Sequence, residues 1–212
     1  MWDYLLRLMK GKTTLLYGEA GSGKTNIALQ ATQLLCRDES RKCFFISCEG
    51  LGFTKVLHRY FFGSNTFFGE AVSLDHLLDM LLGLKDTYPC GEIGVASIDT
   101  VNGHYYDYSG SSKHNTLLNL ILGTLNYLSS ECGTSVLITA RVKEEAADYK
   151  PIAQSPLYMF SDNVVRLTKL CGGVGKLIIE SSSNTGALPK ELGYVIGENG
   201  VQLDRKPRAR YC

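Results

Sequence analysis

Residues 18–25 have the types and spacing of a loop that binds phosphate groups. They read glycine, four further residues, glycine, lysine and threonine. Glycines allow successive backbone N–H groups to turn inward around a phosphate, and a helix that starts after the loop adds the positive end of its dipole. We therefore expect a nucleotide phosphate to be held by Gly18, Glu19, Ala20, Gly21, Ser22, Gly23, Lys24, Thr25 and Asn26.

Two side chains of this loop predict ATP and Mg²⁺ as the bound groups. Lys24 is expected to reach the β- and γ-phosphates, and the hydroxyl of Thr25 is expected to hold a Mg²⁺ ion that bridges them. The alternative is a glycine-rich turn that binds nothing. That alternative is disfavoured because every fixed position of the pattern matches.

Two carboxylates follow apolar runs and complete the chemistry of such a site. Asp99 closes the run at residues 93–98, where a carboxylate can hold Mg²⁺ through water. Glu49 comes shortly after the run at residues 43–47 and is a candidate to orient the water that attacks the γ-phosphate. A solvated loop glutamate is the alternative interpretation of Glu49.

The pattern of apolar residues predicts the elements that position these groups. Short continuous apolar runs are typical of parallel strands covered on both faces, and the segments between them have helical spacing. Such alternation predicts an open α/β sheet whose strand ends line a ligand crevice. Strands are expected at residues 13–17, 43–47, 93–98 and 135–139, and helices at 2–9, 26–35, 53–62, 74–84 and 117–128, with a turn at 63–69.

The carboxyl-terminal third has a different pattern, in which apolar and polar residues alternate around glycine turns. This predicts antiparallel strands that continue the parallel sheet. The fold class is therefore α/β, with a largely parallel central sheet flanked by helices and an antiparallel carboxyl-terminal extension. One domain is expected over residues 1–204, followed by a short basic tail at 205–212, and the antiparallel strands are expected at 163–170, 177–180, 194–196 and 201–203.

Two segments are predicted to be flexible loops at the edge of the sheet that carries the site. Residues 100–112 are rich in glycine, serine and tyrosine and contain His104, and residues 142–159 lack sustained periodicity. The tyrosines at 105, 106 and 108 could stack on bases of single-stranded nucleic acid, or could cover the nucleotide or a partner surface. Both interpretations stay open at this point.

Composition limits the partners and the compartment. Lys plus Arg total 22 against 21 for Asp plus Glu, a formal charge of +1, so any surface for a polyanion must be local. Seven cysteines occur without a C-x-x-C pair, which predicts free thiols in a reducing compartment, with disulfides as an option for a hyperthermophile. Neither a signal peptide nor an apolar run of membrane length is evident, so we expect a cytoplasmic protein without membrane contact.

The order of these segments resembles the RecA superfamily ATPase core, and most of all the archaeal RadB-type or short RadA-like recombinase paralogues. The resemblance implies a RecA-like P-loop ATPase fold and makes Glu49 the catalytic carboxylate. It also implies that residues 102–112 and 142–159 contact DNA. The matching stretches are residues 18–25, 45–50, 97–101, 136–142 and 161–167.

Three departures from the recombinase pattern bear on function. Thr139-Ala140-Arg141 replaces Thr-Asn-Gln, Glu180-Ser181-Ser182-Ser183 stands where basic residues are usual, and the usual amino-terminal domain and oligomerisation linker are expected to be missing. Arg141 could contact the γ-phosphate and act as a catalytic stabiliser, or could pair at the surface with Glu144 or Glu145. These departures favour a mediator or regulator over a strand-exchange enzyme.

The leading interpretation is a weakly hydrolysing ATPase that acts in DNA recombination and repair. It would bind single-stranded DNA, a recombinase protein, or both, and self-association is left open. The alternatives are a KaiC-like signalling ATPase whose loops bind a protein, and a nucleotide-dependent scaffold that does not turn over ATP. Binding of single-stranded DNA and turnover of ATP would distinguish these classes.

Overall fold

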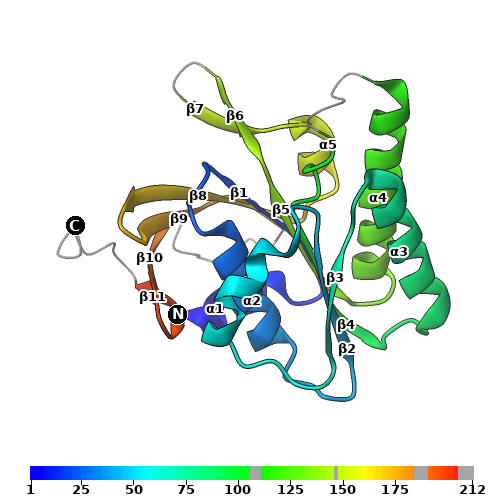
Figure 1. The fold of residues 1–212 in the computed structure, drawn as a ribbon, viewed down its shortest axis with the longest axis horizontal. Helices are drawn as coiled ribbons and strands as arrows, with labels where there is room; N and C mark the ends of the chain where they lie inside the picture. Colours follow the sequence, from blue (N-terminus) through cyan, green and yellow to red (C-terminus); the bar gives the residue numbers. More distant parts are fainter. Residues whose placement is uncertain (106–110, 146–147, 184–190, 205–212) are drawn as a thin grey trace.

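A nine-stranded sheet forms the centre of the computed structural model, which describes residues 1–105, 111–145, 148–183 and 191–204 (Figure 1). The strand order is β11-β10-β9-β8-β1-β5-β4-β2-β3. The strands from β8 to β3 in this order pair in parallel, and β8 to β11 pair antiparallel. Their bounds are β1 Thr13–Gly18, β2 Lys42–Ser47, β3 Thr66–Glu70, β4 Ile93–Asp99, β5 Ser135–Ala140, β8 Asn163–Cys171, β9 Val174–Ser182, β10 Glu191–Gly197 and β11 Gly200–Asp204.

Helices cover both faces of the sheet, because alternate residues of each central strand point to opposite sides. Leu15 of β1 packs in a core with α3 and α4, whereas its neighbour Leu16 packs in a second core with α1 and α2. Figure 1 shows α3 and α4 together along one flank, away from α1 and α2. The helices are α1 Trp2–Met9, α2 Lys24–Leu35, α3 Leu74–Thr87, α4 Ser112–Ser130 and α5 Gln154–Met159, with a 3₁₀ helix η1 at Leu51–Arg59.

This architecture confirms the predicted fold class. The four predicted parallel strands are β1, β2, β4 and β5, and every residue of β1, β4 and β5 is buried. The predicted antiparallel extension is present as β8 to β11. Since the parallel strands run the same way, the ends of β1, β2, β4 and β5 meet at one edge of the sheet, where the candidate site lies.

Residues 142–145, 148–151 and 154–159 form regular structure, so the prediction of a flexible loop is wrong for these residues. The chain makes a hairpin of β6 Val142–Glu145 and β7 Asp148–Pro151, followed by α5. Ile152 and Leu157 are buried in the core on the α3 and α4 side, which anchors the segment after the hairpin. The many charged residues of this hairpin gave it the composition of a loop.

A further strand, β3, occupies much of the segment that the sequence predicts to be a turn. Thr66–Glu70 pairs in parallel with β2 and forms the edge of the sheet. The strand was missed because its burial is intermediate to exposed, so it lacks the clear pattern of an interior strand.

Cysteine pairing also differs from the prediction of free thiols. Disulfides join Cys36 to Cys43 and Cys90 to Cys132, while Cys48 is a buried free thiol and Cys171 is disulfide-bonded as well. The first bridge closes the turn between α2 and β2. The second joins the segments that precede β4 and β5, which are neighbours in the sheet although 42 residues separate the two cysteines. The prediction of free thiols was wrong because the fold brings these cysteines close together, and the absence of a C-x-x-C pair in the sequence says nothing about such proximity.

Some predictions fall on residues outside the described part of the chain. These are the tyrosines at 106 and 108, the basic tail at 205–212 and the cysteine at 212. Among the helices of the described residues, none combines the length and apolar character that crossing a bilayer requires.

Candidate nucleotide-binding site

The loop between β1 and α2 has the geometry that its glycines predict. Gly23 precedes α2 with a φ of 85°, a left-handed conformation that favours glycine. A Cβ atom on Gly18 would lie 2.2 Å from the carbonyl oxygen of Leu167 on β8. The loop therefore begins at a point where only glycine fits between two strands, and it ends at the amino terminus of a helix.

Lys24 points its ammonium group into this loop. Its Nζ donates hydrogen bonds to the carbonyl oxygens of Gly18, at 2.8 Å, and Glu19, at 3.1 Å. Burial lowers the pKa of Lys24, while the negative charges of Asp99 and Glu49 oppose that shift. A phosphate would replace weak carbonyl acceptors by charged oxygens, so the structure fits the predicted role of Lys24.

Thr25 and Asp99 meet at the opening of the loop. Thr25 Oγ1 donates to Asp99 Oδ2 at 2.8 Å, and the hydroxyl of Thr139 donates to Asp99 Oδ1. Burial raises the pKa of Asp99, which is only 4% exposed, and the two hydroxyl donors act in the opposite direction. A hydroxyl and a carboxylate oxygen side by side are suitable ligands for Mg²⁺, so this donor set fits the predicted ion.

Glu49 lies beside this pair because β2 and β4 are neighbours and Ser47 is in register with Asp99. Its Oε1 accepts hydrogen bonds from Thr100 Oγ1, at 2.7 Å, and from Arg141 Nε, at 2.8 Å. Burial alone would raise the pKa of Glu49, but the hydrogen bonds from Arg141 and Thr100, together with the charges of Arg141 and Lys24, lower it below the ordinary value. The side chain is therefore a carboxylate at neutral pH.

A cavity of about 760 Å³ brings most of the predicted residues together, a volume within the range of ligand sites. Two predicted residues of the loop, Glu19 and Ser22, do not line it. The Glu19 carboxylate accepts from the backbone of Lys169, and the Ser22 carbonyl accepts from the hydroxyl of Tyr194. The predicted residues that line the cavity are Gly18, Ala20, Gly21, Gly23, Lys24, Thr25, Asn26, Glu49, Asp99 and Arg141.

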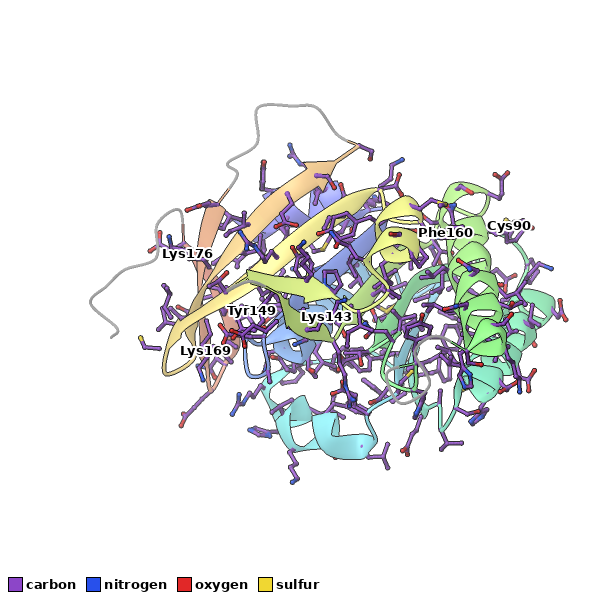
Figure 2. The ribbon with its side chains drawn as sticks, turned by 90° about the horizontal axis from the view of Figure 1, so that it is seen from above. Cys90, Lys143, Tyr149, Phe160, Lys169 and Lys176 are labelled. Carbon is purple, nitrogen blue, oxygen red and sulfur yellow. A yellow bond between two sulfur atoms is a disulfide. The ribbon has the colours of Figure 1, made fainter. Side chains whose placement is uncertain are left out.

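The hairpin β6–β7 borders the same cavity. Val142, Lys143 and Glu144 contribute to its lining, and Ile152 follows immediately after the hairpin. Figure 2 shows Lys143 and Tyr149 on this hairpin and Lys169 near the end of β8. The segment that the resemblance assigns to DNA contact is therefore in direct continuity with the wall of the candidate nucleotide site.

Comparisons with known proteins bear on the sequence and the fold of the whole chain. No family model matches the sequence. The chain is 27% identical over 174 residues to the DNA repair and recombination protein RadB of Methanococcoides burtonii, and the aligned region covers 75% of each of the two proteins. It is 24% identical over 203 residues to the protein of the same name from Methanosphaera stadtmanae, covering 91% of this chain and 88% of the relative.

The comparison with solved structures shows the fold. A crystal structure of the RadB recombinase superposes with a TM-score of 0.74 at 20% identity, covering 94% of this chain and 96% of the other. The predicted resemblance to RadB is confirmed. The RadB-like chain thus has the RecA-like α/β fold over most of its length.

Sequence reasoning missed several residues of this candidate site. Thr100 and Thr139 donate to the two carboxylates, and Tyr194 reaches the phosphate loop from β10. The two threonines could have been found, because each stands at the end of a predicted strand that points to the site. Tyr194 lies 172 residues from Ser22, and nothing in the local sequence signals the contact.

The surroundings of Arg141 match neither of its two predicted roles completely. It lines the cavity, as the γ-phosphate interpretation requires, but its ion-pair partner in the structure is Glu49 rather than Glu144 or Glu145. Both side chains of this pair are more than one-third exposed, so the pair itself contributes little to stability. The importance of the contact is its position beside the candidate catalytic carboxylate.

Proposed function

We propose that the chain binds Mg-ATP, hydrolyses it weakly, and assists DNA recombination and repair as a mediator or regulator. The observation that carries this proposal is the meeting of Lys24, the Thr25–Asp99 pair and Glu49 at one cavity. The names of the relatives, DNA repair and recombination protein RadB, support the biological setting. The proposal includes a single domain over residues 1–204 and a cytoplasmic location.

The residues suggest a division of work in the reaction. Backbone N–H groups of the loop and Lys24 would hold the β- and γ-phosphates, and Thr25 with Asp99 would hold Mg²⁺. When bound, Mg²⁺ neutralises charge on the phosphates. Glu49 would orient the attacking water and accept its proton, since its lowered pKa keeps it ionised at neutral pH.

The proposed macromolecular partners are single-stranded DNA and a recombinase protein. The hairpin β6–β7 and the start of the loop after Asp99 lie at the cavity edge, so a partner bound there could influence the nucleotide site. Lys143 and Tyr149 are residue types that contact phosphates and stack on bases. Self-association is a further part of the proposal that oligomer measurements would address.

Two measurements test the proposed function. We expect slow release of phosphate from ATP by the protein alone, and ATP-dependent binding of a fluorescent single-stranded oligonucleotide whose affinity falls as salt rises. Turnover without DNA binding at low salt would favour a KaiC-like signalling ATPase. Nucleotide binding with no turnover, with or without DNA, would favour a scaffold.

Replacement of Arg141 by glutamine is expected to lower turnover per protomer at saturating ATP by about tenfold, because arginine adds a fixed charge and several donors to the lining of the cavity in which the γ-phosphate is proposed to bind. Thermal stability without ATP should change little, since the Glu49 pair is half exposed. Steady-state phosphate release and thermal unfolding are the measurements. An equal turnover would show that Arg141 does not assist hydrolysis, and a higher turnover would show that it restrains Glu49.

A further inference from the structure

Asn102, just after β4, has a fully buried side chain that contacts two distant segments. The residue is 0% exposed. Its Nδ2 donates to the carbonyl oxygens of Arg141 and Ile152, each at 3.0 Å. Its Oδ1 accepts from the backbone N–H of Arg141 at 2.7 Å. One amide group therefore satisfies three backbone groups from a segment about 40 residues later in the chain.

The two segments that Asn102 joins are the start and the end of the hairpin β6–β7. Arg141 immediately precedes Val142, the first residue of β6, and Ile152 immediately follows Pro151, the last residue of β7. The backbone N–H of Ile152 also donates to the carbonyl oxygen of Arg141 at 3.0 Å. The hairpin is thus closed at its base, and Asn102 is the side chain that fills this closure.

This closure fixes the backbone from which the guanidinium of Arg141 reaches Glu49. Asn102 bonds both the N–H and the carbonyl oxygen of Arg141, and Arg141 Nε lies 2.8 Å from Glu49 Oε1. An asparagine is suited to the position because its amide offers two donors and an acceptor in one plane. A side chain without these groups would leave buried backbone groups without partners, an unfavourable arrangement.

We propose that Asn102 is a positioning residue that ties the loop after β4 to the base of the hairpin β6–β7 and thereby sets the position of Arg141 against the nucleotide site. The inference rests on the proposed ATPase function for its effect on turnover, but its structural part does not. Asn102 does not line the cavity, so in this proposal it acts through Arg141. It also gives a physical connection between two segments that sequence reasoning treated as separate loops.

Asn102→Asp is the sharpest test, because it keeps the size and the acceptor but replaces the two N–H donors by an oxygen that faces two carbonyl oxygens. We expect backbone amides of Val142–Glu145 and of Ile152 to exchange hydrogen about tenfold faster or more in the ATP-free protein. We expect kcat to fall about tenfold with KM changed less than about twofold, since misplacement of a positioned group lowers the rate of the chemical step. Asn102→Ala provides a second variant if the aspartate variant does not fold.

Asn163 supplies a matched control within the same chain. It is also 0% exposed, and its side chain makes three hydrogen bonds, to Leu8, Thr14 and Ser182, away from the cavity. Asn163→Asp should reduce thermal stability without selectively accelerating exchange in the hairpin or lowering kcat. A loss of kcat equal to that of the Asn102 variant would assign the effect to general destabilisation and overturn the proposal.

The double variant with Arg141→Gln tests the route of the effect. If Asn102 acts through Arg141, Asn102→Asp should change kcat by less than about twofold in the Arg141→Gln background. An undiminished effect there, or unchanged hairpin exchange in the single variant, would overturn the proposal. If the unmodified protein releases no phosphate from ATP, the proposed hydrolysis fails, whereas the exchange measurement still supports or overturns the closure of the hairpin by Asn102.

Discussion

Lys24→Ala is expected to abolish tight binding of Mg-ATP, with a loss of affinity of about 100-fold or more. The ammonium group lies inside the phosphate loop, 2.8 Å from the carbonyl oxygen of Gly18, and also donates to the carbonyl oxygen of Glu19. Charge-assisted hydrogen bonds to phosphate are stronger than neutral ones, so the backbone N–H groups of the loop cannot replace it. Titration calorimetry with Mg-ATP measures the difference.

Lys12 provides the control for this experiment. It lies just before β1, at the end of the strand opposite to the loop, and its Nζ pairs with Asp162 at 3.4 Å. Lys12→Ala should leave the affinity for Mg-ATP unchanged. Equal affinity in Lys24→Ala and in the unmodified protein would remove the basis for a nucleotide site at this loop.

The core of this site could be predicted from sequence because its determinants are local. The phosphate loop depends on glycines and a lysine within eight residues, and the strand before it and the helix after it are visible as patterns. Glu49 and Asp99 each follow an apolar run, and parallel strands bring their carboxyl ends to one edge. To predict that the two carboxylates lie close together, it is enough to assume that their two strands are parallel neighbours, and the order of the other strands is not needed.

The surroundings of the site could not be predicted, because they depend on contacts between distant segments. The hairpin β6–β7 places Lys143 opposite Lys150, so the sequence lacks the complementary charges that would have signalled the pairing. Asn102 stands in a stretch with the composition of a loop, and its burial results from Arg141 and Ile152 closing over it. The disulfide from Cys90 to Cys132 likewise depends on the adjacency of β4 and β5.

Arg141 illustrates how an incomplete prediction arises. Its place just past β5 was evident in the sequence, and so was its difference from the glutamine of recombinases. The choice of partner was not, because Glu144 and Glu145 are near in sequence whereas Glu49 is near only after β2, β4 and β5 assemble. The structure thus shows that Arg141 pairs with Glu49, the carboxylate proposed to activate water, and not with the acidic residues that follow it in the sequence.

That carboxylate has a second measurable property, the pH range in which it is ionised. Hydrogen bonds from Arg141 and Thr100 lower the pKa of Glu49 in spite of its burial. A base with a lowered pKa is ionised above that pKa, so its contribution to turnover is present at neutral pH and is lost only as the pH falls through a value below about 4.3, the ordinary value for glutamate. Glu49 should therefore stay ionised between about pH 6 and pH 8, and its ionisation should cause no change of turnover with pH in that range.

Glu49→Gln is expected to lower kcat by about 100-fold or more while the affinity for Mg-ATP stays within about threefold, since general-base catalysis commonly contributes factors of that size. The amide oxygen of glutamine can still accept from Thr100 and Arg141, which keeps the loop in place, but it cannot accept a proton from water. Single-turnover phosphate release and calorimetry separate the two effects.

Glu70 is the control for this substitution, because it ends β3 in register with Ser47 and so places a carboxylate at the end of the neighbouring strand. Glu70→Gln should leave kcat unchanged, since Glu70 does not line the cavity. If Glu49→Gln turns over ATP as fast as the unmodified protein, Glu49 only supports the loop through Thr100 and Arg141. Asp99 or another group would then have to accept the proton.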